Sequence, residues 1–145
     1  MKRFTPAAVI ALSLLNSLLA PPTAFARPAA PPAQQTPQPR YNFAAIHLSG
    51  QHACALTMQG GVLCWGSNQY GQLGNGTTKH SGQPVKVRGL DKGVRAVAMN
   101  DRLTCALTER GGVLCWGYNQ NGQLGDGTKK DRSVPVPVRG LGKGV

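Results

Sequence analysis

The chain has 145 residues and is strongly basic, with 16 Lys and Arg residues against 5 Asp and Glu residues and a formal net charge of +11. This balance favours an acidic polymer as a partner, such as a glycan, an anionic surface or a nucleic acid, but it is also typical of a solvated rim that keeps a protein soluble. The sequence offers no paired carboxylates, no nucleophile with a matched base and no metal-ligand cluster, which argues against an enzyme.

The N-terminal region has the pattern of a secretory signal peptide. A positive start is followed by an apolar stretch over residues 7–20 and by an Ala-Phe-Ala cleavage site at residues 24–26. The apolar stretch is shorter than the about 20 residues that a membrane-spanning helix needs, so an uncleaved anchor is the weaker alternative. We therefore expect a signal peptide over residues 1–26 and a secreted or periplasmic protein. Residues 27–42 are rich in Pro, Ala and Gln, which predicts a stiff linker without a packed core.

The rest of the chain is a tandem repeat. A 13-residue segment that begins at Cys54 returns at Cys105 with two differences, and the same offset of 51 residues holds for the weaker matches around it. Self-similarity at such a period indicates a fold built from one supersecondary unit. We assign the first unit to residues 43–93 and the second unit, with the start of a third, to residues 94–145.

Within the first unit the pattern predicts four short strands and no sustained helical stripe. The strands are expected at residues 44–48, 52–57, 61–65 and 84–88. Four strands in about 50 residues is the size of one propeller blade. The predicted fold class is all-β, a partial β-propeller of two four-stranded antiparallel blades that follows the signal peptide and the linker.

Local residue choices predict the turns and the sheet edge. Residues 58–61 and 109–112 each carry a Gly-Gly pair, which supplies the positive-φ positions of a tight hairpin. Pro135 and Pro137 remove alternate ladder donors, so their strand is expected at an outer edge.

The four cysteines form two equally spaced pairs, Cys54 with Cys64 and Cys105 with Cys115. If each hairpin has a three-residue loop, the two sulfurs lie opposite each other on one face and form a cross-strand disulfide. With a two-residue loop the register slips by one and the sulfurs point to opposite faces. Export permits the bond. Buried free thiols are the main alternative, and metal binding or catalysis is weaker because no His repeats with the cysteines.

The Gly-rich loop at residues 71–74 returns at residues 122–125 and predicts a structural turn. It is not a phosphate loop, because no Lys-Ser or Lys-Thr follows and no helix begins there. Asn75 begins a glycosylation sequon that the second unit lacks.

Trp65 and Trp116 end buried strands and are expected to pack within the blades. The three histidines do not form a constellation. The repeated residues that we assign to a structural signature are Trp65, Gly66, Gly71, Gly74, Trp116, Gly117, Gly122 and Gly125.

Many basic residues follow the Gly-rich loop of each unit, and we expect them on one side of the array. No aromatic residues are interleaved with them, which argues against stacking on nucleic-acid bases. They are Lys79, Lys86, Arg88, Lys129, Lys130, Arg132 and Arg139.

Taken together, these motifs resemble the regulator of chromosome condensation repeat family. The resemblance covers about residues 43–145 and rests on His-x-Cys-Ala-Leu-Thr, Gly-x-Val-x-Cys-Trp-Gly, Asn-x-x-Gly-Gln-Leu-Gly-x-Gly-Thr and Pro-Val. Members typically close seven such units into a β-propeller. The second unit departs from the pattern, because Leu103 and Thr104 stand where the first unit has His52 and Ala53.

The resemblance implies binding rather than catalysis. The eukaryotic namesake exchanges guanine nucleotides on a nuclear GTPase and binds chromatin, but a signal peptide directs this chain elsewhere and no position matches a motif for exchange. The family also includes an exported inhibitor of β-lactamases. We predict a non-catalytic module that mediates protein–protein interaction, with an inhibitor-like role and without cofactor, metal or nucleotide. Binding of an acidic polymer through the basic edge is the alternative, and an enzyme with an unrecognised site is a remote one.

Two units alone would leave apolar faces exposed, since repeat proteins generally need at least about three units for a continuous core. We therefore expect a homo-oligomer, for example three copies in a six-bladed ring, or a fragment of a longer propeller.

Overall fold

A computed structural model of the chain describes residues 40–142. The predicted signal peptide, the linker as far as residue 39, and residues 143–145 lie outside this range. Within it, no helix is long and apolar enough to cross a membrane. The chain forms the strands β1 (Phe43–Leu48), β2 (His52–Thr57), β3 (Val62–Gly66), β4 (Ser81–Lys86), β5 (Val94–Met99), β6 (Leu103–Thr108), β7 (Val113–Gly117) and β8 (Arg132–Pro137).

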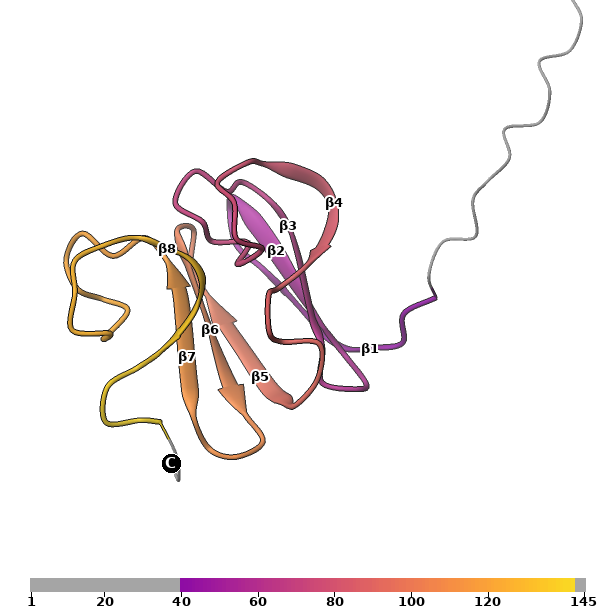
Figure 1. Cartoon of the computed structure of the whole chain (residues 1–145). Coiled ribbons are helices and arrows are strands. Elements are labelled where there is room, and N and C mark those ends of the chain that lie inside the picture. Colours follow the sequence, from indigo (N-terminus) through magenta and orange to yellow (C-terminus); the bar gives the residue numbers. More distant parts are fainter. Residues whose placement is uncertain (1–39, 143–145) are drawn as a thin grey trace, which may run out of the picture. The chain divides into compact units, whose positions relative to one another are not determined.

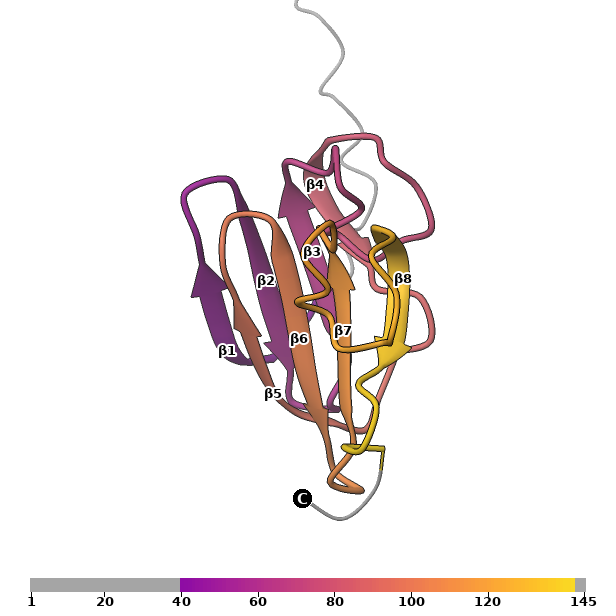
Figure 2. The same ribbon diagram turned by 90° about the vertical axis from the view of Figure 1, so that its left-hand side faces the viewer.

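Each repeat forms one four-stranded sheet (Figure 1). The order is β1-β2-β3-β4 in the first sheet, here called blade 1, and β5-β6-β7-β8 in the second, blade 2, with antiparallel neighbours throughout. The predicted all-β fold with two four-stranded antiparallel blades is confirmed. In Figure 2 the strands of blade 2 lie in front of those of blade 1, so the two sheets are stacked face to face.

The fourth strand lies earlier than predicted, over Ser81–Lys86 instead of residues 84–88. Val87 and Arg88 follow the strand instead of belonging to it. The side chain of Val87 turns into the core and is 1% exposed, and the Arg88 N–H donates to the carbonyl of Gly74 over 2.9 Å. The chain therefore leaves the sheet near the residue that the sequence pattern predicted as the centre of the fourth strand.

The outer-edge prediction for the proline strand is confirmed. Pro135 and Pro137 lie in β8, which pairs with β7 alone at the edge of its sheet. A missing N–H is tolerated at an edge because no further strand needs it as a donor.

The hairpins between the second and third strands have three-residue loops. In blade 1 the Thr57 N–H donates to the carbonyl of Gly61 over 2.8 Å, and Gly60 follows the turn with φ of 77°. This is a type I turn closed by a left-handed residue. Gly61 does not have positive φ, so that part of the prediction is wrong. Glycine is required at position 61 because a Cβ there would stand 2.6 Å from the backbone oxygen of Asp91.

The three-residue loop sets the cysteine register. Cys54 lies opposite Cys64, Cys105 lies opposite Cys115, and each pair is joined by a disulfide. The predicted disulfides are confirmed, and within residues 40–142 no cysteine is left as a free thiol.

The core lies between the two blades, in a contact that we call the joint. Blade 1 contributes the face with Cys54, Leu56 and Val62, and blade 2 contributes the face with Val97 and Trp116. Because side chains alternate along a strand, the opposite faces point away from the joint. The outer face of blade 1 carries Phe43, Ile46, Leu48, Ala53, Leu63 and Trp65, and the outer face of blade 2 carries Leu103, Cys105, Leu107, Val113 and Val136.

We expect the two disulfides to differ in their resistance to reduction. Cys54 and Cys64 are 0% exposed within the joint, whereas Cys105 is only half-buried on the outer face of blade 2. Exchange requires access of a thiolate to a sulfur. In dilute solution, dithiothreitol should therefore reduce Cys105–Cys115 first, as measured by alkylation and peptide mass spectrometry. The matched variants Cys105→Ala/Cys115→Ala and Cys54→Ala/Cys64→Ala should each lose about 2.7 kcal/mol of loop-closure stabilisation, the second also disturbing the joint. Equal reduction rates would contradict the expectation.

Candidate interaction site

A buried chain of hydrogen bonds crosses the joint. His52 Nε2 lies 2.8 Å from Thr104 Oγ1, the Thr104 hydroxyl donates to the carbonyl of Gln72 over 3.0 Å, and Trp116 Nε1 donates to the same oxygen over 2.8 Å. Because the single hydroxyl proton is given to Gln72, the imidazole must be the donor at Nε2. All four residues are buried, His52 being 3% exposed and the others 0%. The network fixes one blade on the other.

His52 is held in its neutral form. Desolvation by burial lowers the pKa of His52 from 6.5 to about 4, and the nearby carboxylate and backbone of Asp101, which favour the charged form, offset only part of that effect. A neutral imidazole keeps the single Nε2 donor that the Thr104 hydroxyl accepts.

Gly74 makes room for Trp116 at the joint. It has φ of 68°, and a Cβ at this position would stand 2.7 Å from Trp116 Nε1. Both the backbone conformation and the close approach of the indole require glycine here.

The Gly-rich loops are built around one buried asparagine in each blade. The Asn68 side chain is 0% exposed, accepts from the Leu73 N–H over 2.9 Å and donates to the carbonyls of Thr77 and Lys79 over 2.9 and 3.0 Å. Asn119 makes the same three bonds in blade 2. These side-chain bonds take the place of regular secondary structure and hold each loop in one shape.

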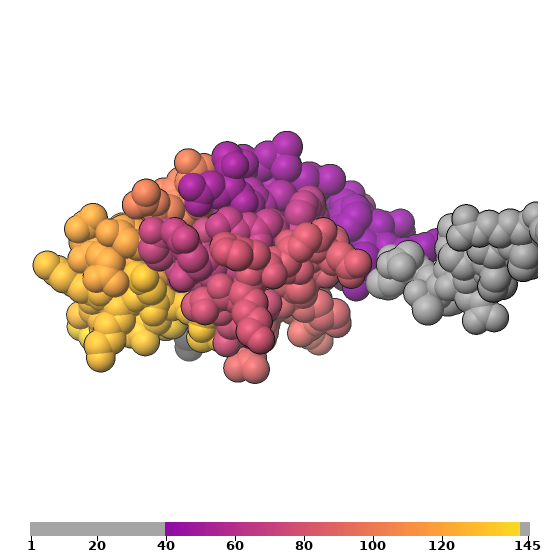
Figure 3. Space-filling model, turned by 90° about the horizontal axis from the view of Figure 1, so that it is seen from above, coloured from indigo at the N-terminus to yellow at the C-terminus, as the bar shows by residue number. Residues whose placement is uncertain are grey.

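Two tyrosines and an arginine gather where three loops meet. Tyr70 comes from the β3–β4 loop, Arg102 from the β5–β6 turn and Tyr118 from the start of the β7–β8 loop. The tyrosine rings pack edge to face with centroids 5.0 Å apart, and Arg102 Cζ lies 5.6 Å from each centroid. We call these three residues the Tyr-Arg cluster. It spans the two repeats, whose surfaces meet along a continuous seam in Figure 3.

The Tyr-Arg cluster is made of residues that the two repeats do not share. Positions that match at the 51-residue offset serve the fold that the two repeats share. A cluster of unmatched residues is therefore a surface feature that requires both repeats. It offers aromatic faces, hydroxyls and a guanidinium, which are binding groups. Among residues 40–142, no three His, Cys, Asp or Glu side chains are placed to hold a metal ion. The counterparts of Tyr70, Arg102 and Tyr118 are Asn121, Gln51 and Ser67.

The β7–β8 loop carries an additional ion pair. Asp126 stands where the first unit has Asn75, and its carboxylate lies 2.7 Å from Arg132. The hydrogen bond from the Thr128 hydroxyl, followed by bonds from the Thr128 backbone, Arg132 and Asn119, holds the pKa of Asp126 far below its usual value despite partial burial.

The predicted basic residues lie along the outer-edge strands β4 and β8 and the segments that flank them. Lys86 is paired with Asp91 over 3.0 Å, which raises the pKa of its amine, and Arg132 is paired with Asp126. The remaining exposed members form what we call the basic rim, which consists of Lys79, Arg88, Lys129, Lys130 and Arg139.

Comparison with known proteins identifies the repeat. A family model described as "Regulator of chromosome condensation (RCC1) repeat" matches residues 59–107 and 110–144, and a second model of the same repeat matches residues 43–72 and 94–123. The chain belongs to the RCC1 repeat family. The resemblance stated from the sequence motifs is thereby confirmed.

The RCC1 relatives are much longer than this chain. The ultraviolet-B receptor UVR8 of Arabidopsis thaliana is 43% identical over 99 residues, which is 67% of this chain and 22% of the receptor. The human E3 ubiquitin-protein ligase HERC2 is 42% identical over 97 residues, or 66% of this chain and 2% of the ligase. The chain therefore spans less than a quarter of either relative.

Solved structures show the same architecture. Human WBSCR16 is 28% identical with a TM-score of 0.57, covering 63% of this chain and 24% of that structure. Prp20p from Saccharomyces cerevisiae aligns with a TM-score of 0.62 over 70% of this chain and 26% of that one, at 18% identity, and so supports the fold alone.

The RCC1 signature residues lie in five settings. Gly74 and Trp116 meet at the joint, while Trp65, at the equivalent position in blade 1, lies half-buried on the outer face. Gly71 faces the backbone of Ser133 across the blades, and a Cβ there would stand 2.5 Å from the Ser133 Cα. Gly66 and Gly117 end the strands β3 and β7. Gly122 and Gly125 lie in the β7–β8 loop.

Sequence reasoning missed three features of this RCC1 pair. Asn68 and Asn119 are the first residues of the repeated Asn-x-x-Gly-Gln-Leu-Gly motif, but the role of their side chains in holding the loops was not assigned, although their exact recurrence was a signal for it. The contact of His52 with Thr104 and the Tyr-Arg cluster join residues from different repeats, and no spacing rule brings such residues together.

Proposed function

We propose that this chain is an exported, non-catalytic RCC1-type module that binds another protein through the Tyr-Arg cluster, in an inhibitor-like manner. The family and the fold indicate a protein–protein interaction module. The single observation that carries the specific proposal is the packing of Arg102 against both Tyr70 and Tyr118 at the seam between the repeats.

Tyrosine and arginine are the residue types that most often dominate binding at protein interfaces. The loops that carry Tyr70 and Tyr118 are held by Asn68 and Asn119, so little conformational entropy remains to be lost when a partner binds. Among the solved relatives, Prp20p is described together with its binding to Gsp1p and histones, and yeast RCC1 (Prp20) in complex with Kap60. A protein partner for this chain is consistent with those cases.

Export is supported by two independent features. The N-terminal pattern is that of a signal peptide, and both disulfides need an oxidising compartment to persist.

A second candidate function is binding of an acidic polymer. It is favoured by the basic rim, because Lys79, Lys129 and Lys130 are exposed beside the outer-edge strands. This attraction would be electrostatic and therefore weakened by salt.

Affinity capture distinguishes the two functions. The full chain is immobilised, incubated with the exported-protein fraction of its source cells and washed in about 1 M salt, where the Debye length is about 3 Å. We expect a discrete protein to remain bound, and Tyr70→Ala/Tyr118→Ala to weaken its affinity about 30-fold, since a hot-spot loss is at least about 2 kcal/mol. Recovery of the endogenous chain from the same fraction checks export.

Two control variants make the result specific. Asn121→Ala changes the counterpart of Tyr70 in the second repeat and should leave binding unchanged. Lys129→Ser/Lys130→Ser should weaken binding only if the partner is an acidic polymer. Retention that disappears in salt and in the lysine variant, but persists in the tyrosine variant, would replace the protein-binding function with the polyanion function.

A further inference from the structure

The outer face of blade 1 and the outer face of blade 2 are complementary. We infer that the outer face of blade 2 docks on the outer face of blade 1 of a second copy, and that the contact repeats the joint between the blades. The inference uses the outer faces and does not depend on the proposed binding of another protein.

The outer face of blade 1 is apolar and exposed where its counterpart in blade 2 is covered. Ile46 is 56% exposed, but Val97, the residue at the same repeat position, is 5% exposed because blade 1 covers it. Phe43 is 43% exposed and its counterpart Val94 is 3% exposed. A contiguous apolar surface of this kind marks an interaction site. Its natural complement is the kind of sheet face that covers the same positions in blade 2.

The outer face of blade 2 has the corresponding open site. A cavity of about 300 Å³ is lined by Asp101, Leu103 and Gln123, together with Asn100 and with Arg102 and Tyr118 of the Tyr-Arg cluster. A docked copy would therefore cover part of that cluster. The blade 1 residues at the repeat positions of Asp101, Leu103 and Gln123 are Gly50, His52 and Gln72. All three of these hydrogen-bond to blade 2, Gly50 to the Asp101 carboxylate, His52 to Thr104, and Gln72 to both Trp116 and the backbone of Asp101. The cavity on blade 2 is thus the unfilled equivalent of a site that is filled on blade 1.

Trp65 is the group that the open site would receive. It is half-buried on the outer face of blade 1, at the repeat position of the fully buried Trp116. A Cβ added to Gly125 would meet only the side chain of Val138, whereas at Gly74 it meets both the corresponding Val87 and the Trp116 indole. Beside Gly125 there is room for an indole, and the backbone carbonyl of Gln123 lies at the repeat position of the Gln72 carbonyl that Trp116 uses.

The repeats differ at two positions of these faces, His52 against Leu103 and Ala53 against Thr104, and the residues at these positions are also complementary between copies. Within the chain, His52 of blade 1 meets Thr104 of blade 2, a polar pair. Between copies, Leu103 would meet Ala53, an apolar pair. Either mixed combination would bury an unpaired polar group, which is costly. The repeats therefore differ in a correlated way that suits both contacts.

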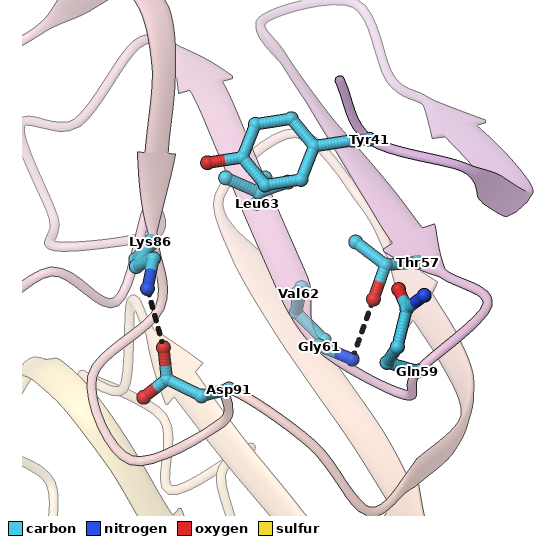
Figure 4. Close-up of a pocket in the computed structure, with 8 residues that line it drawn as sticks. All are labelled: Tyr41, Thr57, Gln59, Gly61, Val62, Leu63, Lys86 and Asp91. Carbon is cyan, nitrogen blue, oxygen red and sulfur yellow. Dashed lines mark hydrogen bonds and ion pairs between the residues drawn. The ribbon is translucent and has the colours of Figure 1, made fainter. Parts of the chain in front are cut away.

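The end of the blade 1 outer face that lies near Tyr41 is already partly covered. In Figure 4 the ring of Tyr41 lies over Leu63, beside the Lys86–Asp91 ion pair, at a pocket of about 150 Å³. The corresponding part of the joint is likewise incompletely filled, with a groove of about 590 Å³ between Leu90 of blade 1 and Leu114 of blade 2. A docking copy would therefore make its main contacts at the Ile46, Leu48 and Trp65 end. Such a head-to-tail contact uses two different faces, so it gives a ring if the rotation between copies closes and an open filament if it does not. A closed ring of about 4 to 8 blades corresponds to two to four copies.

Sedimentation velocity of the full chain tests the inference with an exchange of the matched pair. We expect the wild-type chain to associate with increasing concentration. Leu103→His alone places an imidazole against Ala53 and should weaken association at least about tenfold. Ala53→Thr alone should weaken association less. The double variant Ala53→Thr/Leu103→His recreates the polar pair and should regain association.

Fluorescence provides a second measurement that does not depend on the stability of these variants. The emission of Trp65 should shift to the blue as the concentration rises, and the shift should vanish in Trp65→Phe. A wild-type chain that stays monomeric up to about 1 mM would overturn the inference. So would association that is insensitive to Leu103→His, which would assign the contact to another part of the chain, such as the N-terminal region. Neither result would bear on capture of a different protein by the Tyr-Arg cluster.

Discussion

Replacement of Trp116 with Ala is expected to lower the free energy of unfolding by about 3–5 kcal/mol, the usual range for removing a buried tryptophan. Trp116 is 0% exposed, fills the joint beside Gly74 and donates a hydrogen bond to Gln72. Trp65→Ala removes the same side chain from the same repeat position, but it should cost about 1–2 kcal/mol less. Trp65 is half-buried, and within residues 40–142 no hydrogen bond from its indole is formed.

Urea unfolding of the two variants in dilute solution measures this difference. Trp116→Phe serves as a control, because it keeps most of the apolar contact, loses the indole donor and should lose only about 1 kcal/mol. At higher concentration the gap between the two alanine variants should narrow, if Trp65 becomes buried against a second copy. Equal destabilisation in dilute solution would show that the joint does not hold Trp116 as described.

Acidification should destabilise the protein through His52 between about pH 6.5 and pH 4. The folded chain holds the imidazole neutral, whereas the unfolded chain binds a proton as soon as the pH falls below the ordinary value. The unfolded state therefore binds more protons in this range, and stability falls as the pH falls, by about 3 kcal/mol in total. Below about pH 4 the folded chain is protonated as well and this loss stops growing.

The control for acidification is a histidine-free joint. His52→Gln should flatten the stability curve in this range, and His52→Leu, which copies the second repeat, should flatten it as well. His47→Gln changes a half-buried histidine away from the Thr104 contact and should keep the wild-type slope. Asp126 acts at lower pH, because its depressed pKa means that its contribution is lost only below about pH 4. A wild-type slope that persists in both His52 variants would assign the acid sensitivity to another group.

The covalent and hairpin features were predictable because they depend on short-range spacing. A three-residue loop and the two-residue period of a strand together place Cys54 opposite Cys64, and the repetition of that spacing does the same for Cys105 and Cys115. The edge position of the proline strand follows equally locally, from the absence of two N–H donors. The fourth strand was misplaced because Val87 is apolar enough to belong to a strand but is drawn into the core instead.

The Tyr-Arg cluster could not be predicted by such rules. Tyr70, Arg102 and Tyr118 are contributed by three separate loops, and their contact depends on how blade 2 sits on blade 1. The same holds for His52, whose Nδ1 meets Ser49 of its own repeat but whose Nε2 finds its partner in Thr104 of the next repeat.

The sequence by itself determined the period, the four strands of each repeat and the disulfide within each hairpin, because these follow from spacing along one segment. Only the tertiary structure decided which of two identical residues at equivalent repeat positions is buried and hydrogen-bonded. Trp65 and Trp116 occupy the same place in the same motif, yet stacking one sheet on another covers one face of each, and it is the covered face that sets the burial, the hydrogen bonding and the proton affinity of the residues on it.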